Sequence, residues 1–174
     1  VHISPDCDQM ILQHASGVLY RFSSLNHQFL HKLTNQRFYR LTVSADTMRI
    51  VGQNDRSELW LVDSAGRGEK RIGEGKNVNR LCLSPDGKLL LTLQGSLGKW
   101  ELIARDLESD TERWRHPVGN VAQLCFSPDG SEISVAVNYT TWEIRSPQTG
   151  KVIWQNSDLQ WSQVHYSPSG KRVA

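Results

Sequence analysis

The chain has 174 residues, of which 38% are hydrophobic and 22% charged, and its 20 basic and 18 acidic side chains leave a net charge of +2. A chain of this length can bury a sizeable core. So small a net charge argues against a nucleic-acid partner, and no apolar run approaches the length of a membrane span. We therefore expect a globular protein that binds no nucleic acid and has no membrane segment in this chain.

A four-residue pattern recurs along the chain at an almost constant spacing. It reads Ser4-Pro5-Asp6-Cys7, Ser44-Ala45-Asp46-Thr47, Ser84-Pro85-Asp86-Gly87, Ser127-Pro128-Asp129-Gly130 and Ser167-Pro168-Ser169-Gly170, with serines 40, 40, 43 and 40 residues apart. Pro presets φ at the second position of a β-turn, Asp tolerates the next position, and Gly accepts positive φ. A fixed period near 40 residues is typical of a repeat architecture.

The segments around each turn are rich in strand-forming residues, and no helical periodicity is visible. Taking the repeats in chain order, we expect a first strand before each turn at 41–43, 81–83, 124–126 and 164–166, and a second strand after it at 48–51, 88–92 and 132–137. Third strands are expected at 18–22, 58–62, 100–104 and 141–145, and fourth strands at 29–33, 70–72, 112–114 and 152–154.

Four short antiparallel strands in about 40 residues describe one blade of a β-propeller. The predicted fold is therefore an all-β propeller of four-stranded antiparallel blades, with repeats at about 1–40, 41–80, 81–123 and 124–163 and a partial repeat at 164–174. Four blades either close on themselves or belong to a larger propeller. We favour the larger propeller, because an unclosed array would expose a blade face at each end.

The layout of Leu124–Gly130, followed by Trp142–Ile144 and then Thr149–Trp154, resembles the WD40 and WD40-like propeller superfamily over essentially the whole chain. Two features depart from that family. The Gly-His pair that opens a typical repeat is absent, and Val62, Arg105 and Arg145 stand where Trp is usual. We therefore expect blades held mainly by packing rather than by the family's Asp-His-Ser-Trp hydrogen-bond network.

No group of residues has the spacing that a catalytic or metal site requires. The segment 27–31, with histidines at both ends, has the outline of a zinc-protease motif, but Gln28 replaces the catalytic Glu and the segment falls in a predicted strand. The recurring aspartates are explained by the turn. Phosphate-loop, dinucleotide and nucleophile-elbow motifs are absent from the sequence. We expect no catalytic residue, no metal and no cofactor.

The three cysteines, Cys7, Cys82 and Cys125, do not form a paired framework. Cys82 and Cys125 occupy the same register in two neighbouring first strands, and we expect both to be small buried residues. An odd and unclustered set favours a reducing compartment, and we expect a cytoplasmic protein.

Long polar residues recur at fixed distances before each serine, flanked by apolar residues. In WD40-like proteins this end of the first strand, with the loop between second and third strands, is the common docking surface, so the resemblance implies a binding surface there. Its candidate residues are Arg37, Tyr39, Arg40, Asn54, Arg56, Asn77, Asn79, Arg80, Asn120, Gln123 and Tyr139.

The predicted function is a non-catalytic protein–protein interaction scaffold whose partner is a protein or peptide, and whose neighbours include any remaining blades of the same protein. An alternative is the propeller domain of a larger enzyme or nucleotide-driven sensor, with its catalytic part outside this chain. A third possibility is a sensor that binds small molecules or carbohydrates at the mouth of the propeller's central channel. Fold alone does not separate these functions.

Overall fold

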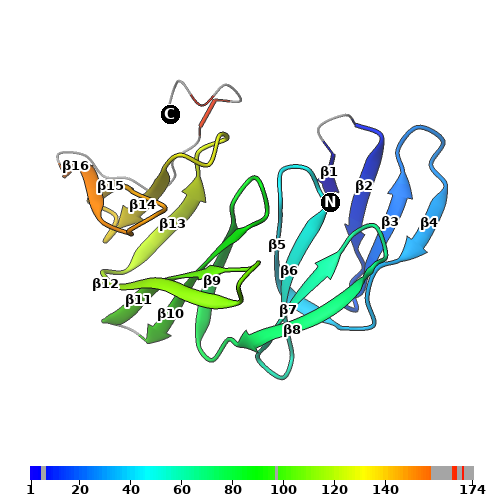
Figure 1. Ribbon diagram of the computed structural model, residues 1–174, viewed down its shortest axis with the longest axis horizontal. Coiled ribbons are helices and arrows are strands. Elements are labelled where there is room, and N and C mark those ends of the chain that lie inside the picture. Colours follow the sequence, from blue (N-terminus) through cyan, green and yellow to red (C-terminus); the bar gives the residue numbers. More distant parts are fainter. Residues whose placement is uncertain (5–6, 97, 158–165, 168–169, 171–174) are drawn as a thin grey trace. The chain divides into compact units, whose positions relative to one another are not determined.

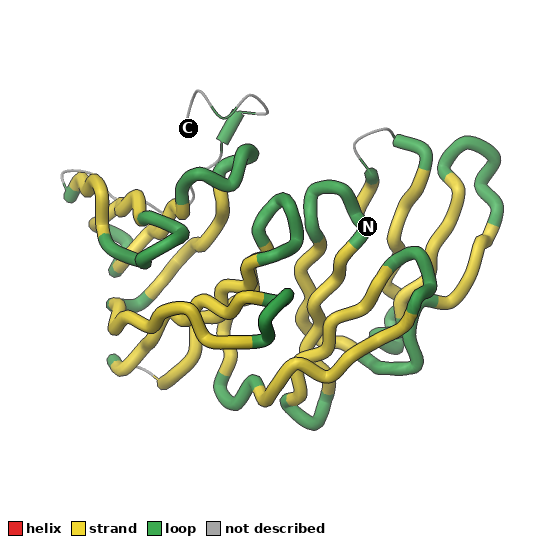
Figure 2. Tube along the Cα trace, viewed as in Figure 1, coloured by secondary structure: helices red, strands yellow, loops and turns green. Residues whose placement is uncertain are grey.

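The computed structural model describes residues 1–4, 7–96, 98–157, 166–167 and 170. Its strands form four antiparallel sheets of four strands each, and in every sheet the strands lie side by side in chain order. Figure 2 shows strands joined by short loops. No helix long and apolar enough to cross a membrane occurs in the described part of the chain. The chain divides into two compact units, residues 1–76 and residues 77–174.

The first unit holds two of the sheets, labelled in Figure 1. One contains β1 (His2–Ile3), β2 (Gln9–Gln13), β3 (Leu19–Ser23) and β4 (Phe29–Lys32). The other contains β5 (Phe38–Val43), β6 (Arg49–Asn54), β7 (Glu58–Asp63) and β8 (Gly68–Glu74).

The second unit holds the other two sheets. One contains β9 (Val78–Leu83), β10 (Leu89–Ser96), β11 (Lys99–Asp106) and β12 (Thr111–Val118). The other contains β13 (Val121–Phe126), β14 (Ile133–Val137), β15 (Thr141–Arg145) and β16 (Val152–Asn156). The first strands of these two sheets, β9 and β13, contact each other.

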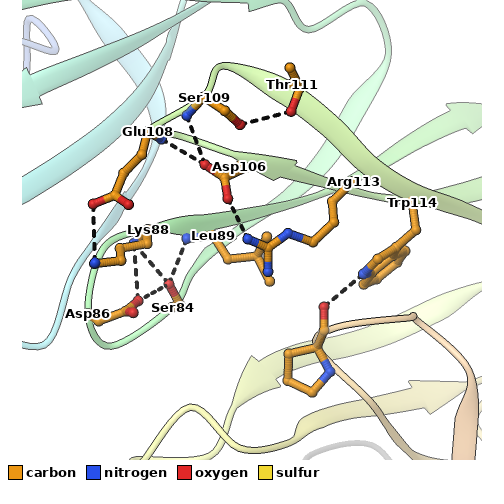
Figure 3. Close-up of polar contacts among 11 residues, drawn as sticks. Ser84, Asp86, Lys88, Leu89, Asp106, Glu108, Ser109, Thr111, Arg113 and Trp114 are labelled. Carbon is orange, nitrogen blue, oxygen red and sulfur yellow. Dashed lines mark hydrogen bonds and ion pairs between the residues drawn. The ribbon is translucent and has the colours of Figure 1, made fainter.

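The recurring serine and aspartate side chains build the turn between the first and second strands. Ser84 Oγ donates to Asp86 Oδ1 at 2.6 Å and accepts the Leu89 N–H at 2.9 Å, while Asp86 Oδ1 accepts the Lys88 N–H at 3.1 Å (Figure 3). Gly87 closes the turn at φ +69°. The same bonds recur after Ser44 and Ser127, so the aspartates have the structural role that turn chemistry predicts.

Each unit has its own hydrophobic core between its two sheets. In the first unit the buried cluster consists of Ile11, Leu19, Leu33, Phe38, Ile50 and Val62. In the second unit it consists of Leu89, Leu91, Leu93, Leu102, Ala104, Val121, Leu124, Phe126, Ile133, Val135 and Val137. In the second cluster the buried residues alternate along β10 and β14, because successive side chains of a strand point to opposite faces.

Three of the tryptophans pack against these cores, Trp60 in the first unit and Trp100 and Trp114 in the second. Trp142 meets Trp154 edge to face, with ring centroids 5.1 Å apart, and its indole N–H donates to Ser134 Oγ at 2.8 Å. This bond joins a third strand to a second strand within one sheet. The sequence does not predict this tryptophan–serine contact.

The predicted fold class is confirmed: the structure is all-β and is built of four-stranded antiparallel propeller blades. Strands occupy all the predicted segments outside the fifth repeat. The first strand of that repeat, at 164–166, falls almost entirely outside the described residues. The first strands β5, β9 and β13 begin at Phe38, Val78 and Val121, two or three residues before the repeat boundaries expected from the sequence.

Candidate functional site

A cleft of about 530 Å³ opens in the first unit, on the side where the first strand of the second sheet begins. Two of the predicted residues, Arg37 and Tyr39, line it. The remaining wall comes from the β2–β3 turn and the β6–β7 turn, namely Gln13, His14, Ala15, Ser16, Gly17, Phe38 and Asp55. The sequence predicts both turns, but the repeat register alone did not single out His14, Ser16 or Asp55 as site residues.

A β-bulge directs Tyr39 outward. In the pairing of β5 with β6, Phe38 lies opposite Asn54 and Arg40 lies opposite Gln53, so Tyr39 is the extra residue of the ladder. Bulges re-aim side chains and are frequent next to binding sites. The Tyr39 side chain is 55% exposed, and the Arg40 guanidinium carbon lies 5.9 Å from the centre of its ring. The pair forms a cation–π contact at the edge of the cleft.

The floor of the cleft is held by one backbone hydrogen bond and one side-chain hydrogen bond to Phe38. The Phe38 N–H donates to the Gly17 carbonyl at 3.0 Å, and Gln13 Nε2 donates to the Phe38 carbonyl at 2.6 Å. A Cβ on Gly17 would lie 2.7 Å from the Phe38 carbonyl oxygen, and its φ is +85°. Only glycine fits this position, so the cleft is shaped before any partner arrives.

Asn54 does not belong to the exposed binding surface, which corrects the prediction. Its side chain is only 2% exposed, because its amide nitrogen donates to Gln36 Oε1 and to Glu58 Oε2 at 3.1 and 2.9 Å. Its amide oxygen accepts the N–H groups of Arg56 and Glu58. Asn54 therefore shapes the β6–β7 turn from inside rather than facing a partner.

The arginines of this end of the unit remain at the surface: Arg37, Arg40 and Arg56 are all exposed. The nearby carboxylate of Glu58 is already engaged. It accepts hydrogen bonds from Asn54 and Trp60, which lower its pKa, and it pairs with Arg71 at 3.2 Å. Arg56 also contributes to the lowered pKa of Glu58 through its charge, whereas Arg37 makes no ion pair within the described residues.

The other predicted residues lie in the second unit. Asn79 is the extra residue of a bulge between β9 and β10, in the same register as Tyr39. Arg80 is exposed, and its Nε donates to the Val121 carbonyl of β13 at 3.5 Å. Gln123 follows a third bulge of the same register, between β13 and β14. The same β-bulge thus recurs in three first strands, β5, β9 and β13.

The remaining residues of the second unit occupy turns. Asn77 has φ +55°, and its carbonyl accepts the Gly95 N–H at 3.2 Å. The Asn120 N–H donates to the side chain of Asn138 at 2.9 Å. Tyr139 is 55% exposed at φ +59°, a region that bulky residues seldom adopt. A strained and exposed aromatic side chain is a feature of binding sites.

A second groove, of about 280 Å³, lies in the second unit beside the Ser-Pro-Asp-Gly turns. Each of its two cations is paired with a carboxylate (Figure 3): Lys88 pairs with Glu108 at 3.2 Å, and Arg113 bonds to Asp106. The Ser109 N–H and the Arg113 guanidinium hold the pKa of Asp106 at about 2. Because both cations of this groove are already paired with carboxylates of the protein, we do not take it as the candidate site.

The two cysteines of the first strands, Cys82 and Cys125, are partly buried free thiols. Burial raises the pKa of Cys82 to about 12 and also raises the pKa of Cys125, so both are poor nucleophiles. Within the described ranges, no cluster of three or more His, Cys, Asp or Glu side chains is arranged to hold a metal ion. His31 lies on β4, a strand and not the helix that a zinc-protease motif requires.

The structure resembles the crystal structure of the β-propeller domain of Myceliophteria thermophila Cps50 (Swd1), with a TM-score of 0.75 and 11% sequence identity. The match covers 99% of this chain and 60% of that chain, so the chain spans less than two thirds of the solved propeller domain. The sequence matches no protein-family model and no curated protein. At this level of identity the likeness shows the propeller fold.

Proposed function

We propose that this chain is a non-catalytic interaction platform, formed by WD40-like blades of a larger propeller, that binds a protein or peptide through the cleft of its first unit. The observation that carries the proposal is the cleft itself. It has a floor fixed by hydrogen bonds, an exposed aromatic residue on a bulge and exposed arginines. Tyr and Arg are the residue types that most often dominate interface energies.

Rigid display is the mechanism. The Gly17–Phe38 and Gln13–Phe38 bonds fix the two walls of the cleft, so little conformational entropy is lost when a partner docks. Tyr39 supplies apolar area at low entropic cost, since its ring has only two side-chain torsions. Exposed residues of the same types also occur in the second unit, at Arg80 and Tyr139.

The WD40-like part of the proposal rests on the sequence pattern together with the fold. The Ser-Asp turn chemistry recurs at Ser44, Ser84 and Ser127, and the strands follow in the order typical of a blade. The free thiols of Cys82 and Cys125 fit a protein of a reducing compartment such as the cytoplasm.

Selection from a phage library of random 12-residue peptides tests the proposal. We expect peptides that bind the intact protein and lose most of their affinity when Tyr39→Ala is introduced. Arg67→Ala, on the β7–β8 turn, is the control and should leave binding unchanged. Failure to enrich any peptide, or turnover of a substrate at the cleft, would contradict a binding platform.

A further inference from the structure

Two exposed arginines lie at the cleft of the first unit. Arg37 lines the cleft, Arg56 follows Asp55 in the adjoining turn, and both are exposed. Neither has an ion pair within the residues that the structure describes. The Arg40 guanidinium lies over the ring of the neighbouring Tyr39, and it places a third positive charge at the same end of the unit.

Most other exposed arginines are compensated by carboxylates of the protein. Arg67 pairs with Asp63 at 2.9 Å, Arg71 with Glu58 at 3.2 Å, and Arg115 with Glu112 at 2.8 Å. An exposed guanidinium such as that of Arg37, which lines a cleft and makes no ion pair within the described residues, provides charge complementarity for an incoming anion.

The geometry favours a carboxylate over a phosphate. A guanidinium binds either group with two parallel hydrogen bonds, but Asp55 lines the same cleft and contributes one negative charge. Repulsion from Asp55 is larger for a phosphate, which carries about −1.5 to −2 charges near neutral pH, than for a singly charged carboxylate. A duplex nucleic acid would require many more cations than these three arginines.

We infer that the cleft recognises an acidic segment of a partner protein, in which an Asp or Glu carboxylate binds Arg37 while neighbouring residues pack on Tyr39. This inference rests on the proposed function and names the chemistry of its partner. The Arg37 guanidinium donates two hydrogen bonds to the carboxylate, and Arg56 and Arg40 attract the remaining acidic residues of the segment.

Fluorescence anisotropy with defined peptides tests the inference on the intact protein. The probes are labelled 12-residue peptides of one design, four repeats of Gly-Glu-Ser, Gly-Gln-Ser, Gly-Lys-Ser or Gly-phosphoserine-Ser. We expect the Glu peptide to bind about tenfold more tightly than the Gln peptide, the gain of one charge-assisted contact. Its affinity should fall as salt is raised, because salt screens exposed charges.

Variants locate the effect. Arg37→Ala should weaken the Glu peptide by about tenfold and bring it close to the Gln peptide, whereas Arg67→Ala removes the same charge from the β7–β8 turn and should change nothing. Equal binding of Glu and Gln peptides, equal losses from both variants, or tighter binding of the phosphoserine peptide would overturn the inference. Library peptides that lack acidic residues yet depend on Tyr39 would also overturn it, while leaving the proposed function intact.

Discussion

Replacing Gly52 with alanine should destabilise the first unit by forcing Phe38 out of its place. Gly52 lies on β6, and a Cβ built on it would fall 2.4, 2.5 and 2.6 Å from three carbons of the Phe38 ring. Carbon atoms pack best at about 3.5–4.0 Å, so the ring must move by about 1 Å or more. Phe38 is only 2% exposed and its backbone is bonded to Gly17 and Gln13, which leaves little room for that movement.

Overpacking of this kind costs about 1–3 kcal/mol, and for a chain of this size 1 kcal/mol lowers Tm by about 2–4 °C. We therefore expect Gly52→Ala to lower Tm by roughly 5 °C in a thermal unfolding scan followed by circular dichroism. Because Phe38 lies between Arg37 and Tyr39, the variant should also weaken peptide binding.

A second substitution makes the test specific. Phe38→Ala removes the three ring carbons that meet the new methyl group, so the double variant Gly52→Ala, Phe38→Ala should be more stable than the sum of the single losses predicts. An unchanged Tm for Gly52→Ala, or strictly additive losses in the double variant, would refute this packing argument.

Three further substitutions test the turns and the ion pairs. Gly130 has φ +73°, so Gly130→Val should lower stability by about 1–2 kcal/mol in chemical denaturation and Gly130→Asn by less, since Asn tolerates this region; equal losses would argue against the turn. Hydrogen bonds from Ser127 and Ser131 depress the pKa of Asp129 to about 2. The stability gained from its charge is thus complete above about pH 4 and lost as pH falls towards 2, so Asp129→Asn should flatten the Tm–pH curve there; an unchanged acid limb would contradict this. Arg145 is 7% exposed and bonds to Glu143 at 2.7 Å, so Arg145→Ala should cost about 3 kcal/mol, against less than about 1 kcal/mol for the exposed Arg115→Ala; similar losses would be inconsistent with a buried pair.

The strands could be predicted from the sequence because the signal is local and repeated. Ser84 and Asp86 define a turn by bonds within five residues, and the apolar alternation on either side defines the strands. Because the same pattern recurs in every repeat, the strand positions predicted in one repeat agree with those predicted in the next. The eleven candidate residues came from that register together with the resemblance to WD40-like proteins, and two of them, Arg37 and Tyr39, line a cleft.

What the sequence could not predict depends on contacts between sheets or on local irregularity. The bulge at Tyr39 changes the direction of the side chain without any marker residue such as Gly or Pro. The burial of Asn54 follows from its bonds to Gln36, in the loop before β5, and to Glu58, the first residue of β7. The second wall of the cleft, around His14, is brought to Arg37 by the packing of one sheet on the next.

The central claim is that a partner docks in the cleft of the first unit. Backbone amide chemical shifts of the isotopically labelled protein, recorded by NMR during titration with a selected peptide, test it most directly. The largest chemical-shift changes should fall on residues 13–17, 36–40 and 54–57. Changes concentrated on the Ser-Pro-Asp-Gly turns at 84–89 and 127–132, with the cleft unaffected, would contradict it.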